Sequence, residues 1–182
     1  MKIMAKKVLI LSSSPRRGGN SDRLCDRFMA GAREAGHEVE KIFLKDLNIG
    51  YCTGCGACYG GARPCPQKDD AAGVIAKMVG ADVIVMATPV YFYTLSAQMK
   101  TLIDRCCARY VEMTGKEFYF ILAAAEQSVP MMERTVECFR GLLDCLEGPR
   151  EKGVVYGVGA WQAGDIEGMP AMDEAYVMGR GV

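Results

Sequence analysis

Short apolar runs alternate along the chain with longer stretches in which apolar residues recur every three or four positions. The runs predict buried strands at Lys7–Ser12, His37–Leu44, Asp82–Ala87, Glu117–Ala125 and Gly153–Val158. The periodic stretches predict helices that start near Ser21, Asp70, Ser96, Met131 and Pro170. Strands that alternate with helices are typical of a parallel sheet with helices on both faces, so we predict an α/β fold.

Composition favours one globular domain over residues 1–182, because half of the residues are hydrophobic and no repeat or linker divides the chain. The 22 basic residues balance 22 acidic ones, which argues against a nucleic-acid or anionic-membrane partner. No apolar run approaches the roughly 20 residues that span a bilayer. Nine cysteines without a secretory signal predict a cytoplasmic protein, since thiols stay reduced there.

Four of these cysteines share one glycine-rich stretch with the spacing C-x2-C-x2-C-x6-C. Thiolates select iron–sulfur clusters, zinc or copper(I), and overlapping C-x2-C pairs suit a cluster better than zinc. A cluster, a zinc ion and redox-active thiols all remain open for this cysteine loop, which carries Cys52, Cys55, Cys58 and Cys65 within an insertion at about residues 45–68. Core packing is the favoured interpretation of the cysteines in predicted helices, namely Cys25, Cys106, Cys107, Cys138 and Cys145.

The loop after the first predicted strand, Ser12–Ser21, reads S-S-S-P-R-R-G-G-N-S. Ligands of parallel α/β sheets bind beyond the carboxyl ends of the strands, and hydroxyls, arginine and helix N–H groups suit a phosphate monoester. The loop has neither the P-loop nor the G-x-G-x-x-G pattern, which argues against a nucleoside triphosphate or a dinucleotide. The phosphate ligands we predict are Ser14, Arg16, Asn20 and Ser21; an ordinary turn with a helix cap is the alternative.

A second specialised stretch, Pro89–Tyr93, follows the third predicted strand. Proline ends the strand, and we expect the backbone N–H groups of Val90, Tyr91 and Phe92 to be free beside aromatic rings. A flat, amphipathic ring system would stack there. Together with a phosphate at the first loop, this favours a flavin, whereas simple covering of the core by the aromatic rings is the alternative.

The segments S-S-S-P-R-R-G-G-N-S and T-P-V-Y-F-Y-T-L-S-A-Q-M-K-T-L-I-D-R resemble the two FMN loops of the NADPH-dependent FMN reductase group of the flavodoxin-like superfamily. With the cysteine loop between them, the chain is similar to the iron–sulfur flavoproteins of anaerobic prokaryotes. The resemblance covers roughly residues 7–125. It implies a flavodoxin-like, doubly wound, five-stranded parallel sheet in the order 2-1-3-4-5, which flavodoxin itself has.

The same resemblance implies bound FMN, with its phosphate on the four residues named above and its isoalloxazine ring bordered by Pro89, Val90, Tyr91 and Phe92. It also implies a [4Fe–4S] cluster on the cysteine loop, which we expect beside the flavin end of the sheet. A homodimer or homotetramer would bring one subunit's cluster near another's flavin. The segment Ala125–Ser128 occupies the place of a third flavin contact, and Trp161 is expected either to cover the flavin or an interface, or to pack locally.

These features predict an FMN-dependent oxidoreductase that relays single electrons between FMN and the cluster, with ferredoxin or NAD(P)H as redox partner. No residue is assigned as a catalytic acid or base, since His37 starts a strand and the cofactors carry the chemistry. An NAD(P)H-dependent FMN or quinone reductase without a cluster is the first alternative. A non-catalytic zinc or thiol sensor is the second.

Overall fold

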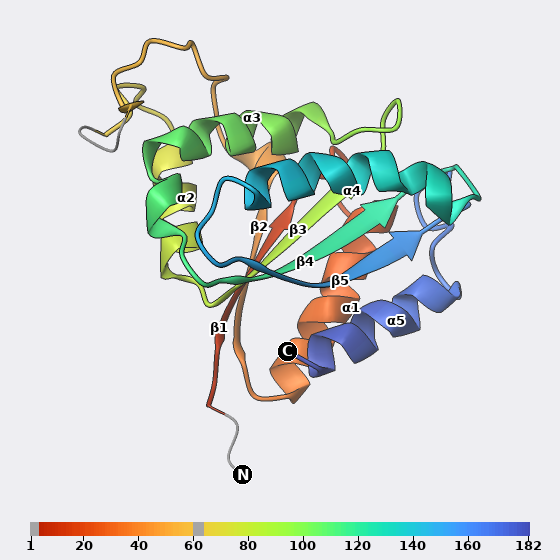
Figure 1. Ribbon diagram of the computed structural model, residues 1–182. Coiled ribbons are helices and arrows are strands. Elements are labelled where there is room, and N and C mark those ends of the chain that lie inside the picture. The colour runs from red at the N-terminus through yellow and green to blue at the C-terminus, as the bar shows by residue number, and fades with distance from the viewer. Residues whose placement is uncertain (1–3, 60–63) are drawn as a thin grey trace.

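A five-stranded parallel sheet forms the centre of the molecule (Figure 1). The computed structural model describes residues 4–59 and 64–182, so part of the cysteine loop, residues 60–63, lies outside the described residues. The strand order β2-β1-β3-β4-β5 confirms the predicted flavodoxin-like order. The strands are β1 (Lys7–Ser12), β2 (Glu38–Phe43), β3 (Val83–Pro89), β4 (Glu117–Ala123) and β5 (Arg150–Gly157).

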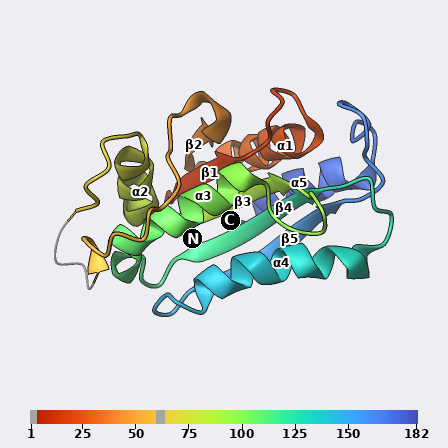
Figure 2. The same cartoon turned by 90° about the horizontal axis from the view of Figure 1, so that it is seen from above.

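Helices cover both faces of this sheet, as Figure 2 shows from above. They are α1 (Asn20–Glu34), α2 (Ala71–Gly80), α3 (Ala97–Arg105), α4 (Val129–Leu143) and α5 (Pro170–Arg180). Helices α1 and α5 pack on one face, and α2, α3 and α4 pack on the other. Short 3-10 turns are η1 (Leu44–Asp46), η3 (Cys106–Ala108) and η4 (Tyr110–Glu112). None of the described helices has the length and apolar character that crossing a membrane requires.

The central strands are buried on both faces, which explains why they read as continuous apolar runs. In β3, Val83 and Val85 join the core under α1 and α5, whereas Ile84 and Met86 join the core under the other three helices. Successive side chains of a strand point to opposite faces. Each apolar side chain of the run therefore packs into one of the two hydrophobic cores.

The edge strand β5 departs most from its predicted bounds, because it begins at Arg150 rather than at Gly153. Residues 150–152 are exposed, and charged residues on an edge strand discourage pairing with another chain. The start of this strand therefore cannot be predicted from hydropathy alone. The sequence predicts a helix from about Ser96 to Arg109, whereas α3 ends at Arg105 and two 3-10 turns continue the chain.

Buried hydrogen bonds join the loops at the carboxyl ends of β1 and β3. The Ser13 N–H and hydroxyl both donate to the Ala87 carbonyl, at 3.0 and 2.8 Å. The Ser96 hydroxyl, which also caps α3, donates to the Ser13 hydroxyl at 2.9 Å. These contacts fix the loop after β1 relative to the start of α3.

Candidate functional site

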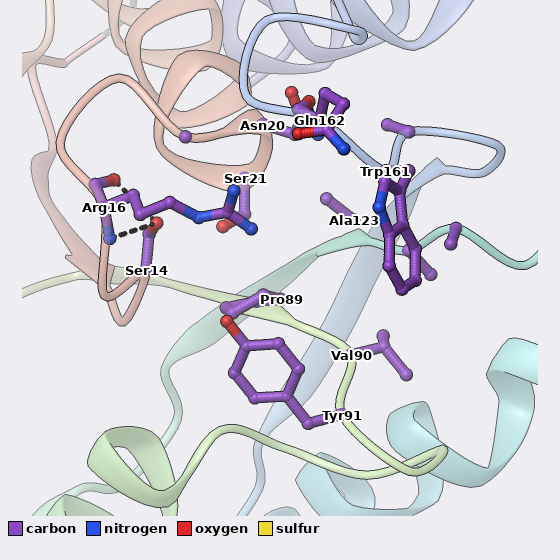
Figure 3. Close-up of a pocket in the computed structure, with 14 residues that line it drawn as sticks. Ser14, Arg16, Asn20, Ser21, Pro89, Val90, Tyr91, Ala123, Trp161 and Gln162 are labelled. Atoms are coloured by element: carbon purple, nitrogen blue, oxygen red, sulfur yellow. Dashed lines mark hydrogen bonds between the residues drawn. The ribbon is translucent and has the colours of Figure 1, made fainter.

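A cleft lies at the carboxyl end of the sheet, where the loops after β1, β3, β4 and β5 meet. Its volume of about 340 Å³ lies within the range of small-molecule sites, about 300–1,000 Å³. Of the residues predicted to hold the phosphate or to border the ring, all except Phe92 line this cleft (Figure 3): Ser14, Arg16, Asn20, Ser21, Pro89, Val90 and Tyr91. Two loops that are far apart in sequence thus form one concave site.

The loop after β1 is folded tightly around its own backbone. The Ser14 hydroxyl accepts from the Arg16 N–H at 3.1 Å and donates to the Arg16 carbonyl at 2.7 Å. Gly18 has a φ of 63°, which favours glycine. A Cβ on Gly19 would lie only 2.7 Å from the Ser14 hydroxyl oxygen. The turn therefore requires glycine where the backbone passes the base of the cleft.

Ser21 provides a buried polar group without a partner. It is 2% exposed, and among the described residues its hydroxyl has no hydrogen-bond partner. It lies in the first turn of α1, which has no side-chain cap, and the first N–H groups of a helix lack partners within the helix. An anion at this helix start would satisfy the hydroxyl and the N–H groups together. The site thus fits a phosphate group.

Asn20 and Arg16 differ in how free their side chains are. The Asn20 amide donates to the Gln162 carbonyl at 2.8 Å and accepts from the Gly164 N–H at 2.9 Å. Asn20 therefore fixes the loop after β5 against the start of α1. The Arg16 side chain is exposed and extends across the cleft toward Ser21 in Figure 3, where it can add positive charge.

Asp22 is a supporting residue that was not predicted from the sequence. It is 4% exposed and accepts from the Gly18 N–H at 3.0 Å, the Ser12 hydroxyl at 2.8 Å and the Lys41 ammonium at 3.0 Å. Burial favours the neutral acid, but these three donors outweigh it and lower the pKa of Asp22. An ionised carboxylate therefore holds the glycine turn. An acidic residue in the first turn of a helix was the only signal in the sequence.

The loop after β3 borders the cleft differently from the prediction. The expectation of free N–H groups is wrong for Val90, which donates to the Ala123 carbonyl at 2.9 Å, and for Tyr91, which donates to the Thr94 carbonyl at 3.1 Å. The first bond continues the pairing with β4, and the second closes a turn. These two residues therefore offer side chains and carbonyl groups to a ligand.

Phe92 does not line the cleft and is fully exposed, at 101%. Phe92 and Tyr93 both have positive φ values, 51° and 59°, which costs non-glycine residues energy. Both line a second hollow next to the cleft, together with Glu126, Gln127 and Trp161. The rings of Phe92 and Tyr93 therefore lie at the second hollow, beyond the place where the sequence predicted the ring of the cofactor.

The loops after β4 and β5 complete the walls. Ala123, Ala124 and Ala125 line the cleft, whereas Glu126 and Gln127 line only the second hollow. Trp161, 70% exposed, lines both hollows, so its position favours the first of the two roles considered for it. The N–H group of Ser128 and the hydroxyl of Tyr93 lower the pKa of Glu126. Its carboxylate orders the loop that carries it.

The cysteine loop lies next to α2, far from β5 and α5 (Figures 1 and 2). Cys65 contacts Arg105 at the end of α3, whereas Ser96, before the start of α3, contacts the loop after β1. The nine residues of α3 separate these contacts by about 13 Å. The expectation that the loop lies beside the flavin end of the sheet is therefore wrong within one chain.

The cysteines of the loop are only partly brought together. Cys52 and Cys55 are exposed and Cys58 and Cys65 are half-buried, and the described residues contain no group of three or more potential ligands placed for a metal ion. Burial and then the Cys107 thiol raise the pKa of Cys58, and the charge of Cys65 raises it further. Positive φ values at Gly54 and Gly56, with open space around both, allow tight turns between the thiols. Four thiols on such a backbone fit a thiolate-bound cluster.

Three of the remaining cysteines contradict their predicted core packing. Cys25 and Cys106 are buried, as predicted, but Cys107, Cys138 and Cys145 are exposed. Cys107 belongs to a 3-10 turn after α3, where the helical periodicity used for the prediction no longer holds. It lies beside Cys58 of the cysteine loop.

Comparison with known proteins agrees with this geometry. The family model of NADPH-dependent FMN reductases matches residues 6–147. An iron-sulfur flavoprotein of Archaeoglobus fulgidus is 37% identical over 99 residues, which cover 54% of this chain and 44% of that protein. An iron-sulfur flavoprotein of Methanocaldococcus jannaschii is 40% identical over 99 residues, which cover 54% and 51%. The chain spans about half the length of the curated relatives it matches.

Solved structures share the whole fold. The NAD(P)H:quinone oxidoreductase from Methanothermobacter marburgensis has a TM-score of 0.73 at 20% identity, covering 97% of this chain and 96% of that chain. An FMN-dependent NADH-azoreductase from Bacillus anthracis, in complex with FMN, has a TM-score of 0.72 at 14% identity, covering 96% and 97%. These likenesses establish the fold. Because the family model matches most of the chain, the protein belongs to the NADPH-dependent FMN reductase family.

Proposed function

We propose that the protein is an FMN-dependent oxidoreductase that binds FMN in the cleft and a [4Fe–4S] cluster on the cysteine loop, and relays single electrons between them. The observation that carries the FMN site is Ser21, a buried hydroxyl without a partner among the described residues, at the uncapped start of α1. A phosphate monoester supplies the acceptors that this hydroxyl and the helix N–H groups lack.

In this proposal, Ser14, Arg16 and Ser21 hold the phosphate, while Asn20 keeps the loop after β5 against it. Pro89, Val90 and Tyr91 border the ring system on one wall, and Trp161 closes the opposite wall. When bound, FMN supplies one- and two-electron chemistry and the cluster supplies one-electron chemistry. The residues of the cleft bind and orient the cofactor, so no side chain is assigned as an acid or a base.

For the cluster, we propose Cys52, Cys55, Cys58 and Cys65 as the ligands. The support is their soft donor chemistry, the glycine turns between them and the names of two relatives that are about 40% identical. The distance between the loop and the cleft within one chain supports a homodimer or homotetramer in which the cluster of one subunit serves the flavin of another. Ferredoxin or NAD(P)H is the proposed redox partner.

The second candidate function is an NAD(P)H-dependent FMN or quinone reductase without a cluster. The hollow between Phe92, Tyr93 and Trp161 favours it, because its volume of about 580 Å³ next to the cleft could take a flat second substrate. The solved quinone oxidoreductase of the same fold supports this alternative. A zinc or thiol sensor without catalysis is the third outcome that a metal analysis distinguishes.

The test of the FMN site is the affinity of the apoprotein for FMN, measured by quenching of flavin fluorescence. Ser21→Ala removes one hydrogen bond to a charged phosphate, about 1.5–3 kcal/mol, so FMN should bind at least about tenfold more weakly. Thr114→Ala is the control, because Thr114 is exposed and lies before β4, at the opposite end of the sheet. Equal affinity for both variants would contradict this site.

A further inference from the structure

Arg105, the last residue of α3, is a buried charge directed at the cysteine loop. Its side chain is 2% exposed, and that of its partner Asp69 is 8% exposed. Asp69 follows the last cysteine of the loop. The ion pair therefore connects the core of the domain to the loop from the inside, where water does not screen it.

The guanidinium binds both ends of the loop. Its Nη1 donates to the Gly50 carbonyl at 2.8 Å, before the first cysteine, and to the Gln67 side-chain oxygen at 3.1 Å, after the last. Asp69 in turn accepts from the Gly50 N–H at 2.9 Å and the Ala71 N–H at 3.1 Å. Arg105 and Asp69 thus join the segment that enters the loop to the segment that leaves it.

The same guanidinium donates to a cysteine sulfur. Both Nη atoms contact Asp69, at 2.6 and 3.1 Å, and Nη2 also donates to the Cys65 Sγ at 3.3 Å. A bidentate pair fixes the plane of an arginine fork, so the second Nη2 hydrogen has a defined direction. Lysine could not copy this arrangement, because its ammonium lacks the planar fork.

Stability alone does not explain a buried ion pair of this kind. The desolvation of two buried charges cancels much of their attraction, and apolar replacements are often at least as stable. The Arg105 Nε has no partner among the described residues, which adds to the cost. An N–H donor to sulfur, by contrast, has a direct effect on a thiolate-bound cluster, because it favours the more negative, reduced state.

We propose that Arg105 is a positioning residue of the cysteine site, which holds Cys65 for the cluster and raises the reduction potential of the bound cluster through its N–H···S hydrogen bond. This inference rests on the proposed function, since it requires a cluster on the loop. It assigns to the end of α3 a role that the cysteine spacing alone does not indicate.

The experiment compares the intact, anaerobically purified protein with three variants. Arg105→Gln combined with Asp69→Asn removes the sulfur donor without leaving an unpaired buried carboxylate. Asp69→Asn alone keeps the guanidinium that contacts Cys65. Arg109→Gln is the matched control, because Arg109 lies one turn further on and pairs with Glu112 in an exposed position. Iron and sulfide content and the potential of the cluster, followed by electron paramagnetic resonance, are the measurements.

We expect the double variant to hold its cluster at a lower potential than the wild type, or to retain FMN and lose iron, while Arg109→Gln keeps both properties. Asp69→Asn, which frees the guanidinium at Cys65 from its fixed plane, should give a smaller change in the same direction. Each result would support the role of Arg105. A double variant with the iron content and potential of the wild type would overturn this inference and leave the proposed function intact. A wild-type chain without iron would overturn the cluster proposal, and this inference with it.

Discussion

Gly19 determines how closely the backbone can approach a bound phosphate. Its missing side chain leaves room for the Ser14 hydroxyl, which would lie 2.7 Å from a Cβ, and for the Arg16 carbonyl, which would lie 2.9 Å from it. Contacts this short require the turn to move. The position of the phosphate ligands therefore depends on one glycine as much as on the side chains that touch the ligand.

Gly19→Ala should weaken FMN binding by about fivefold or more, because overpacking costs about 1–3 kcal/mol and displaces Ser14. Gly141→Ala, in α4, is the matched control, since a Cβ there meets no atom within 4 Å. Flavin fluorescence quenching measures both variants. Tight binding by Gly19→Ala would show that the turn does not hold the cofactor.

Asp22 connects the glycine turn to the pH dependence of stability. Its pKa is lowered in the folded protein, because hydrogen bonds to the ionised form outweigh burial. A lowered pKa stabilises the fold above the ordinary value of 3.8, and this stability is lost as the pH falls through the folded value. The fold should therefore weaken below about pH 4 partly through this one group.

Asp22→Asn should lower the free energy of unfolding near neutral pH by about 2 kcal/mol and flatten its decline below pH 4. Urea unfolding at a series of pH values measures both effects. Asp173→Asn is the control, because the Asp173 side chain is 88% exposed. If the free energy of unfolding of Asp22→Asn fell below pH 4 as steeply as that of the wild type, the role of Asp22 would be contradicted.

At the scale of the elements, two glycines allow α1 and α5 to pack backbone against backbone. A Cβ on Gly31 would lie 2.1 Å from the Tyr176 carbonyl oxygen, and one on Gly179 would lie 2.1 Å from the Phe28 carbonyl oxygen. This contact places α5, and the chain before it, next to the start of α1. It thereby helps to bring Trp161 to the cleft.

Gly31→Ala should destabilise the protein by about 3 kcal/mol, because neither backbone can yield without separating the helices. Gly73→Ala, at an open position of α2, should instead stabilise it by up to about 1 kcal/mol. Urea unfolding compares the two. Equal stabilities would mean that α1 and α5 are not held this closely.

The sequence predicted the elements well where one physical signal dominated. The first five residues of β3, Val83–Ala87, are apolar and buried, so the strand was recognisable, although it continues through Thr88 to Pro89. The start of β5 was missed because its first residues, Arg150–Lys152, are exposed and charged. The exposure of Cys107 was missed because helical spacing ends at Arg105.

The cleft and the cysteine loop lie apart in the whole molecule, and local sequence could not indicate this. The phosphate-loop residues were predictable, since a loop after a strand and before a helix has a known position in a parallel sheet. The position of Trp161 and the contact of Arg105 with Cys65 depend on tertiary packing between segments far apart in the chain. That the chain forms one domain over residues 1–182 stays a prediction.

The proposed function of the whole molecule depends on both sites. The proposal assigns no acid or base to either site, so the proposed function rests on the cofactors that the loops would hold. The separation of the loops within a chain makes the assembly of subunits part of the proposal. The cofactor content of the protein is therefore the property on which the proposed function depends.

The most direct test is an absorption spectrum of the anaerobically purified protein, with analysis of FMN, iron, zinc and acid-labile sulfide. The account predicts a yellow-brown protein with about one FMN, four iron and four sulfide per chain. A yellow protein without iron would contradict the cluster and favour the reductase without one. A colourless protein that contains zinc would contradict the account as a whole.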